Sequence, residues 1–315
     1  MTRRPTVAVV VPVRDGASLL GELLGALSAQ TCRPDDVVVV DDRSTDASAD
    51  TAVRAGARVL TGGGGPYRSR NTGWRATSAD VVAFVDVRSR PEPRWLEQTA
   101  ALFGDDAVAM ATSETVVVGG DSLVERASVL QQVFDVRTYV DTPWFLPYFA
   151  TCNLMVRRSA LVGVGGFAEV RSGGDADLCW RIQLAGLGSV AVVREPLMRW
   201  RARTGLRNAL EQTHRYGRSR VELSTRFADR GAPSAEVAPA RVMGPYLARA
   251  TAALAVRQVS RRQPDAAARN LLSVYRGATW LGSRRELGSR REPGRAQVPA
   301  ATTTTNEGAA DDHAG

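Results

Sequence analysis

Four aspartates of this chain have the type and spacing of ligand-binding carboxylates, because each comes within two residues of the end of a short apolar run. They are Asp15, Asp41, Asp42 and Asp86, and the runs are residues 7–13, 37–40 and 81–85. The carboxyl ends of parallel strands form the edge where α/β proteins bind ligands, so we expect a polar substrate or a metal ion at Asp86. Each aspartate alone is explained equally well by a turn or a helix terminus, so only the whole set indicates a site.

The elements that must position these aspartates are strands and helices in alternation. The expected strands are residues 7–13, 37–40, 58–60 and 81–85, and the expected helices are residues 18–27, 49–55 and 67–76. We expect Ser18 to cap the first helix and Ser44 or Thr45 to cap the second. Gly73 should allow its helix to pack closely. This alternation predicts an α/β fold with a mostly parallel, doubly wound sheet of Rossmann-like type.

Composition limits the class of protein but not its activity. The 315 residues are 44% hydrophobic and 23% charged, as in ordinary globular proteins, and the net charge of +8 comes from arginine alone. No nucleic-acid-binding motif accompanies these arginines, so we expect no nucleic acid as a partner. We expect a basic solvated surface, with attraction to phosphorylated ligands or an anionic membrane face as the alternative. Three widely spaced cysteines favour free thiols in a reducing cytoplasm. No apolar run is long enough to span a membrane.

Several linked motifs within residues 7–223 resemble the non-processive members of the bacterial family 2 inverting glycosyltransferases, which have the GT-A fold. The motifs are Val9 to Asp15, Val39 to Asp46, Arg70 to Gly73, Val85 to Arg88, Thr151 to Leu161, Gly165 to Phe167 and Gly173 to Arg181. The processive signature QxxRW does not occur in the sequence. The resemblance therefore implies a hexosyltransferase that adds one sugar per visit, in cell-envelope or natural-product glycosylation.

The resemblance also implies roles for residues on the donor side. Asp41 matches the position that contacts the nucleobase, with the Pro12 backbone and Arg14 beside the nucleotide. The donor would be a UDP-, GDP- or dTDP-linked sugar. Arg70 suits a phosphate, because a guanidinium can pair two oxygens at once. Asp86 matches the first carboxylate of the DxD motif, which holds Mg²⁺ or Mn²⁺ on the diphosphate of the donor.

Two departures put this cation in doubt. The second carboxylate of the DxD motif is Arg88, and a later position where many relatives have a metal-ligand histidine is Trp200. Our hypothesis is that Arg88, with Arg199 or Arg201, supplies part of the charge neutralisation that a metal performs elsewhere. The alternative is that Arg88 points into solvent.

On the acceptor side, the resemblance implies that Asp175 is the catalytic base. An inverting transfer needs a base within hydrogen-bonding reach of the acceptor hydroxyl, and Asp175 matches the second member of an acidic pair whose first member is here Gly174. We also expect Asn153 and Asp177 to line the acceptor site. Both aspartates could instead be helix-terminal carboxylates.

The predicted organisation is a GT-A domain followed by a helical extension and a tail. We place the domain at residues 5–223, with a nucleotide-sugar half at about 5–90 and an acceptor half at about 91–223, the extension at 224–285 and a disordered tail at 286–315. Arginine-bearing amphipathic helices within residues 243–274 would either dock on an anionic membrane, at the inner face, or form a helical cap.

The expected activity is inverting transfer of one sugar from a nucleoside-diphosphate sugar to the hydroxyl of a glycan, lipid or small molecule. One alternative is a catalytically weakened family member that binds nucleotide sugar or a partner protein, motivated by Arg88 and Trp200. Another is a nucleotidyltransferase of related fold. That class requires a glycine-rich loop after the first strand, and residues 12–16 do not form one.

Overall fold

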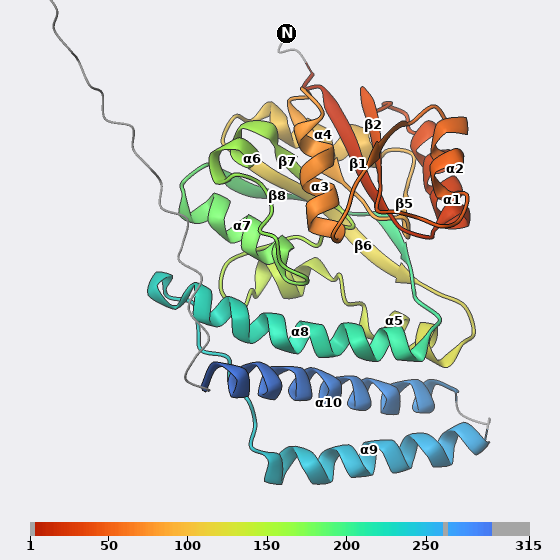
Figure 1. The fold of residues 1–315 in the computed structure, drawn as a ribbon, viewed down its shortest axis with the longest axis vertical. Helices are drawn as coiled ribbons and strands as arrows, with labels where there is room; N and C mark the ends of the chain where they lie inside the picture. The colour runs from red at the N-terminus through yellow and green to blue at the C-terminus, as the bar shows by residue number, and fades with distance from the viewer. Residues whose placement is uncertain (1–3, 261–263, 292–315) are drawn as a thin grey trace, which may run out of the picture.

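The structure, a computed structural model, describes residues 4–260 and 264–291. These residues form one mixed sheet with helices on its faces and a layer of long helices beside it (Figure 1). The strand order in the eight-stranded sheet is β3-β2-β1-β4-β7-β6-β8-β5. The predicted α/β class of GT-A type is confirmed by this architecture together with the fold similarities described below.

The first half of the chain builds a parallel block, because strands and helices alternate in it as predicted. Its elements are β1 (Val7–Val13), α1 (Ala17–Ser28), β2 (Asp36–Asp41), α2 (Ser48–Arg54), β3 (Arg58–Thr61), α3 (Pro66–Arg75) and β4 (Val81–Phe84). Strand β1 pairs in parallel with β2 and with β4, and all four residues of β4 are buried. Strand β4 ends at Phe84, so Asp86 lies on the loop that follows the strand.

The second half adds antiparallel pairs to the sheet. Its elements are β5 (Ser89–Pro91), α4 (Trp95–Ala101), η1 (Leu102–Gly104), β6 (Val108–Val118), α5 (Leu123–Gln131), η2 (Arg137–Asp141), β7 (Leu154–Arg157), α6 (Arg158–Val164), α7 (Gly174–Leu184) and β8 (Ser189–Arg201). Strand β7 is antiparallel to β4 and β6, and β5 is antiparallel to β8. The sheet is therefore parallel in four of its seven strand pairs.

Close packing of α3 against the sheet depends on Gly73. A Cβ atom at this position would lie 2.4 Å from Val10 Cγ1 and 3.2 Å from Val40 Cγ2, distances that no side chain could occupy. The predicted reason for this glycine is confirmed. Because Gly73 has no side chain, α3 can pack directly on β1 and β2.

Three long helices lie beside the sheet in the order α8, α10, α9 (Figure 1). They are α8 (Leu206–Arg226), α9 (Ala240–Ser260) and α10 (Pro264–Arg291), and the short η3 (Ala228–Arg230) follows α8. Helices α8 and α10 approach closely, because a Cβ at Gly217 would lie 1.8 Å from the Thr279 carbonyl oxygen. A small apolar core that includes Leu271 and Tyr275 joins α10 to α5 and α8. The C-terminal helices therefore cap the domain.

The predicted helix caps were wrong. Ser18 lies inside α1, and Gly16 and Ala47 precede α1 and α2 without side-chain caps of their own. Aspartate supplies the cap instead, since the amide of Ala17 donates to Asp46 Oδ2 at 3.0 Å. The apolar periodicity predicted both helices correctly, but the first residue of α1 is capped by Asp46 from the loop after β2.

The helical extension runs further than predicted. Helix α10 continues to Arg291, so residues 286–291 are helical and do not belong to a disordered tail. Glu286 is buried there and pairs with Arg218 of α8 at 2.9 Å. The rest of the predicted tail, residues 292–315, lies outside the described residues. Within the described ranges, no helix is both long and apolar enough to cross a bilayer.

Candidate active site

The loops after β1 and β2 are fixed to each other by carboxylate hydrogen bonds. Asp15 Oδ1 accepts from the Thr45 amide at 2.7 Å and from the Thr45 hydroxyl at 3.0 Å, and these bonds lower the pKa of Asp15. Asp46, whose pKa is lowered by hydrogen bonds from Ala17 and Ser48, holds the same two loops at the start of α1. Both aspartates therefore shape the rim, and neither is free to serve as a ligand.

The residues expected near the nucleobase lie together at the ends of β1 and β2. Val13 is opposite Asp41 in the register, so Pro12 and Asp41 are near neighbours across the two strands. The Asp41 carboxylate accepts from the Ser44 amide at 3.2 Å and remains partly exposed. Arg14 is exposed beside Asp15. This arrangement agrees with a base-binding edge but does not test it.

Asp42 has a structural role that sequence reasoning did not assign. It is buried, and its two oxygens accept from the amides of Gly64 and Gly65 at 3.2 and 3.1 Å. Both glycines have positive φ, at 91° and 111°, which side chains rarely adopt. Asp42 therefore sets the loop that leads into α3 and its arginine.

Arg70 of α3 is a buried cation without a protein anion. Its side chain is only 5% exposed, and its Nε has no hydrogen-bond partner. Within residues 4–260 and 264–291, no ion pair to its guanidinium is found, and the group lies 5.4 Å from the centroid of the Tyr67 ring. An unpaired buried charge is costly unless a ligand compensates for it, so Arg70 fits the phosphate-binding role that we predicted.

Asp86 lies where the loop after β4 meets β8. The indole N–H of Trp200 donates to Asp86 Oδ1 at 3.1 Å and lies 3.4 Å from Oδ2, and the Asp86 amide donates to the Ser89 hydroxyl at 3.3 Å. Trp200 is buried and stands opposite Ser89 in the register of β5 and β8. The residue at the histidine position thus contacts the first carboxylate of the motif directly.

Arg88 does not point freely into solvent. Its Nη1 donates to the carbonyl oxygen of Ala202 at 3.0 Å, and burial, followed by repulsion from Arg203, lowers its pKa. The two other arginines in our charge-neutralisation hypothesis are already paired. Arg199 binds Glu92 at 2.6 Å and Arg201 binds Glu22 at 2.6 Å, so naming them as partners of Arg88 was wrong.

Arg203 is the arginine that the sequence reasoning missed. The Nε of Arg203 is buried and has no hydrogen-bond partner. Burial lowers the pKa of Arg88, and repulsion from the nearby Arg203 lowers it further. Arg203 lies three residues after Trp200, on the segment between β8 and α8. Nothing in the sequence distinguishes Arg203 from Arg199 and Arg201, which alternate with it, because only the ion pairs of the other two differ.

Asp175 lies at the start of α7 and faces Tyr67 of α3. The Tyr67 hydroxyl donates to Asp175 Oδ1 at 3.3 Å, and the Ala176 amide is 3.1 Å from the same oxygen. Burial raises the pKa of Asp175, against the lowering effects of the Ala176 amide, Arg70 and Tyr67. A carboxylate with a raised pKa at a helix start is suited to accept a proton.

Gly174 takes the place of an acidic residue because Tyr67 occupies the space. A Cβ at Gly174 would lie 2.9 Å from two ring atoms of Tyr67. An aspartate or glutamate at this position would therefore collide with the ring that contacts Asp175. The ring of Tyr67 can occupy its place because residue 174 is glycine and has no side chain.

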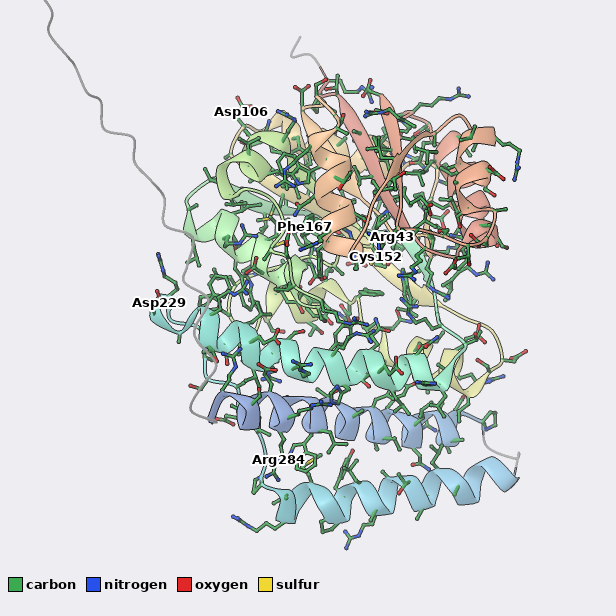
Figure 2. All side chains as sticks on the ribbon, in the orientation of Figure 1. Arg43, Asp106, Cys152, Phe167, Asp229 and Arg284 are labelled. Atoms are coloured by element: carbon green, nitrogen blue, oxygen red, sulfur yellow. The ribbon has the colours of Figure 1, made fainter. Side chains whose placement is uncertain are left out.

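Cys152 lies between the two halves of the site. Its thiol is fully buried, and its pKa is raised first by burial, then by the charges of Asp86 and Asp175, while Arg70 opposes them. Ser89 Oγ lies 2.7 Å from the Cys152 carbonyl oxygen and 3.3 Å from Asp86 Oδ1, so Asp86 is beside Cys152, which stands above α8 in Figure 2. The structure brings Arg70, Asp86 and Asp175 together, although they come from α3, the loop after β4 and α7.

Asp177 has a structural role that sequence reasoning did not assign. Its side chain is 1% exposed, and it is held by Arg181 at 2.7 Å and by Arg226 at 2.6 Å. Both carboxylate oxygens are paired in this structure, and the predicted contact of Asp177 with the acceptor stays a prediction. Asp177 ties α7 to the end of α8.

Asn153 makes internal hydrogen bonds and also lines the adjacent cavity, so its predicted contact with the acceptor stays a prediction. Its Oδ1 accepts from the Trp95 indole at 2.8 Å, and its Nδ2 donates to Ser113 and Thr115 at 3.0 Å or less. The side chain is 2% exposed. These bonds satisfy the amide, which fixes the floor of the neighbouring cavity.

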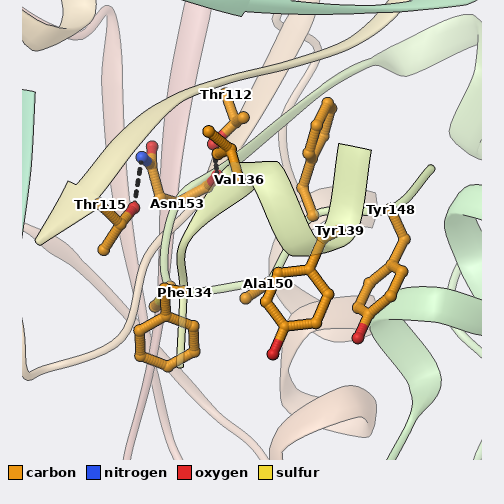
Figure 3. Close-up of a pocket in the computed structure, with 10 residues that line it drawn as sticks. Thr112, Thr115, Phe134, Val136, Tyr139, Tyr148, Ala150 and Asn153 are labelled. Carbon is orange, nitrogen blue, oxygen red and sulfur yellow. Dashed lines mark hydrogen bonds between the residues drawn. The ribbon is translucent and has the colours of Figure 1, made fainter. Parts of the chain in front are cut away.

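A cavity with aromatic walls opens next to Cys152 (Figure 3). It is lined by Thr112, Thr115, Phe134, Val136, Tyr139, Tyr148, Phe149, Ala150, Cys152 and Asn153. Tyr139 and Tyr148 meet edge to face with ring centroids 4.8 Å apart, and burial, together with the charge of Asp175, raises the pKa of Tyr139 to about 12. The cavity is therefore on the side of Cys152 and Asp175. No periodic pattern in the sequence predicts this segment.

The residues around Asp86 do not fit a metal site built by the protein. Across the described ranges, no group of three or more histidine, cysteine, aspartate or glutamate side chains could hold an ion. Neither the guanidinium of Arg88 nor the indole of Trp200 offers a lone pair to a cation. The predicted role of Asp86 as a metal ligand therefore lacks a second protein ligand in this structure.

Comparisons with known proteins agree with this geometry. The model of the family described as Glycosyl transferase family 2 matches residues 8–165. A pre-mycofactocin glycosyltransferase from Mycobacterium tuberculosis is 35% identical over 239 residues, which are 72% of this chain and 49% of that protein. A validoxylamine A glucosyltransferase from Streptomyces hygroscopicus subsp. limoneus is 29% identical, over 67% of this chain and 53% of that protein. The chain thus spans about half the length of these relatives.

Two solved structures share the fold. A glucosyl-3-phosphoglycerate synthase from Mycobacterium tuberculosis, in complex with Mn²⁺, UDP-glucose and phosphoglyceric acid, has a TM-score of 0.52 at 20% identity, over 75% of this chain and 83% of that chain. A mannosyltransferase from Pyrobaculum calidifontis, in complex with GDP-mannose and Mn²⁺, has a TM-score of 0.55 at 18% identity, over 94% and 77%. At these identities the similarity establishes the fold alone.

Proposed function

This chain belongs to glycosyl transferase family 2, and we propose that it transfers one sugar, with inversion at the anomeric carbon, from a nucleoside-diphosphate sugar to an acceptor hydroxyl. The observation that carries the proposal is that Arg70 and Asp175 both contact Tyr67, while Ser89 holds Asp86 beside Cys152. A phosphate-binding cation and a carboxylate with a raised pKa then flank one space. The related proteins that bind UDP-glucose and GDP-mannose support this class of donor.

Asp175 acts as the base in this proposal. It takes the proton of the acceptor hydroxyl as the oxygen of that hydroxyl forms a bond to the anomeric carbon. The bond from that carbon to the diphosphate breaks, and its electron pair remains on the diphosphate. Burial keeps the pKa of Asp175 above its ordinary value, which brings its basicity closer to that of the hydroxyl and favours proton transfer.

Tyr67 separates and aligns the two charged groups. Its ring lies under the Arg70 guanidinium, 5.4 Å from centroid to carbon, and its hydroxyl contacts Asp175 at 3.3 Å. The leaving diphosphate and the attacking hydroxyl must be on opposite sides of the anomeric carbon in an inverting reaction. We propose that the Tyr67 ring, which contacts both groups, holds Arg70 and Asp175 in fixed positions before a donor binds.

We propose that the acceptor enters the cavity beside Cys152. Four aromatic side chains in its wall can stack on a sugar ring or an apolar group, and the hydroxyls of Tyr139 and Tyr148 remain neutral because burial raises the pKa of both. This supports an acceptor with an uncharged ring near the reacting hydroxyl. Whether it is a glycan, a lipid or a small molecule is left to an acceptor panel.

Magnesium or manganese is not given a step in this proposal, since the residues around Asp86 do not fit a protein-built ion site. We propose a reducing compartment such as the cytoplasm, because all three cysteines carry free thiols. The predicted contact of the C-terminal helices with an anionic membrane stays a prediction. Their packing on α8 and α5 supports the helical-cap alternative.

The donor class is tested by thermal-shift measurements with UDP-, GDP- and dTDP-sugars, each with EDTA, Mg²⁺ or Mn²⁺. The stabilising donor is then incubated with an acceptor panel, and the anomeric configuration of the product is determined by NMR. We expect one nucleotide to stabilise the protein and the product to be inverted. A retained configuration would refute the role of Asp175, and donor binding without transfer to any acceptor would favour the catalytically weakened alternative.

A further inference from the structure

We propose that guanidinium groups, and not a divalent cation, neutralise the donor diphosphate in this protein, and that Trp200 makes this possible by occupying Asp86. The inference rests on the proposed function, since it concerns the same donor. It is motivated by two groups of residues. One is the Trp200–Asp86 pair, and the other is a set of arginines that form no ion pair among the described residues.

Trp200 takes the position that a metal would need on Asp86. Its indole N–H is 3.1 Å from Asp86 Oδ1 and 3.4 Å from Oδ2, so a cation bound to both oxygens would displace it. The indole is a donor with no lone pair to offer a metal. It is also held in place, because its ring is 4% exposed and packs edge to face on Phe134 at 5.1 Å.

Three arginines form no ion pair with a carboxylate in the part of the chain that the structure describes. Arg88 is bound only to backbone carbonyl oxygens, Arg203 has a buried Nε without a partner, and Arg215 of α8 has no ion pair among the described residues. Burial and then repulsion from Arg203 lower the pKa of Arg88, and the charge of Asp86 opposes them. Burial and then repulsion from Arg171 lower the pKa of Arg215, with a smaller contribution from Arg203 and an opposing one from Glu211. A bound anion relieves this repulsion.

The contrast with neighbouring arginines shows that this set is selective. Arg199 and Arg201 alternate with Trp200 along β8 and are compensated by Glu92 and Glu22. The positive charges of Arg199 and Arg201 on β8 are thus paired with carboxylates, whereas Arg203 has no ion pair among the described residues. Preorganised positive groups of this kind stabilise the charge that develops on a leaving diphosphate.

The first test is calorimetric titration of the full chain with UDP, GDP and dTDP, in EDTA and in Mn²⁺. For the nucleotide that binds, we expect the two Kd values to agree within about 3-fold, because no step needs the cation. Binding that requires Mn²⁺, with a loss of about 30-fold or more in EDTA, would overturn this inference and leave the proposed function standing. No binding of any nucleotide in either buffer would overturn both.

The second test uses variants of Trp200. Trp200→Phe keeps an aromatic ring but removes the N–H, so we expect nucleotide affinity in EDTA to fall about 10-fold and Mn²⁺ to restore it. Trp200→His supplies a metal ligand opposite Asp86, and we expect tighter Mn²⁺ binding in electron paramagnetic resonance titrations. Metal dependence unchanged in both folded variants would refute the role of Trp200.

The third test uses Arg203 with a matched control. Arg203→Gln should weaken nucleotide binding by about 10-fold or more in EDTA, because it removes a charge-assisted contact. Arg207→Gln removes a solvated arginine four residues later, which pairs only with Glu211 of its own helix, and should change the affinity less than about 2-fold. Equal effects of the two variants would indicate a general charge effect and overturn a specific site.

Discussion

Replacing Asp175 by asparagine separates its proposed catalytic role from any structural role. The substitution keeps the size of the side chain and an oxygen that can accept from Tyr67 and from the Ala176 amide. It removes the ability to take a proton, together with the negative charge of the ionised carboxylate. We therefore expect donor affinity to change little and the transfer rate to fall by about 10²- to 10⁴-fold, the usual contribution of a positioned general base.

The stability of the same variant has a predictable sign. Burial raises the pKa of Asp175 in the folded protein, so the folded state binds this proton more tightly than the unfolded chain. The stability associated with the neutral form is then lost as pH rises from the unfolded pKa through the folded pKa. Above that window the buried charge is destabilising, and Asp175→Asn should leave Tm unchanged or raise it.

Asp177→Asn is the matched control, two residues away on the same helix. It breaks the ion pairs with Arg181 and Arg226 around a carboxylate that is 1% exposed. Removing one partner of a buried pair costs about 3–5 kcal/mol, so we expect Tm to fall by on the order of 10 °C. The two neighbouring aspartates should thus respond in opposite ways.

The assays are nucleotide release, product formation and thermal unfolding at mildly alkaline pH. Retention of more than about a tenth of the wild-type rate in Asp175→Asn would refute its role as base. A marked fall in Tm for the same variant would show that the carboxylate is a structural partner and not a poised base.

Three further predictions concern packing, donor binding and pH. Gly217→Ala places a Cβ 1.8 Å from the Thr279 carbonyl oxygen, so the free energy of unfolding should fall by about 1–3 kcal/mol in denaturant titration. Arg70→Lys replaces a planar fork by a point charge, and we expect KM for the donor to rise about 10-fold with little change in Tm. Tyr67→Phe removes the hydrogen bond that lowers the pKa of Asp175, so the acidic limb of kcat/KM should move to higher pH.

Each of these predictions has a control. A Cβ added at Gly244 of α9 would meet open space, so Gly244→Ala should not destabilise the protein, and equal losses at both glycines would contradict the close packing of α8 and α10. Arg75→Lys, at an exposed position on the same helix as Arg70, should leave donor KM unchanged. An acidic limb that stays in place in Tyr67→Phe would exclude Asp175 as the titrating group.

The sequence alone determined the parallel half of the fold and the position of its ligand edge. Runs of β-branched residues followed by leucines at helical spacing predict β1, α1 and β2 from local patterns. A carboxylate that directly follows a buried strand is expected at the carboxyl edge of the sheet. Gly73 could be explained in advance for the same reason, because close packing of a helix on a strand demands a missing side chain.

Only the tertiary structure decided which charged residues are free. Asp175 and Asp177 are two residues apart, yet Asp177 forms an ion pair with Arg226 from another helix. Asp175 accepts a hydrogen bond from the hydroxyl of Tyr67. Arg201 and Arg203 are equally close in sequence, and one is paired with Glu22 of α1. A carboxylate or guanidinium acts on a ligand only when no protein partner satisfies it, and such partners come from elements distant in the chain.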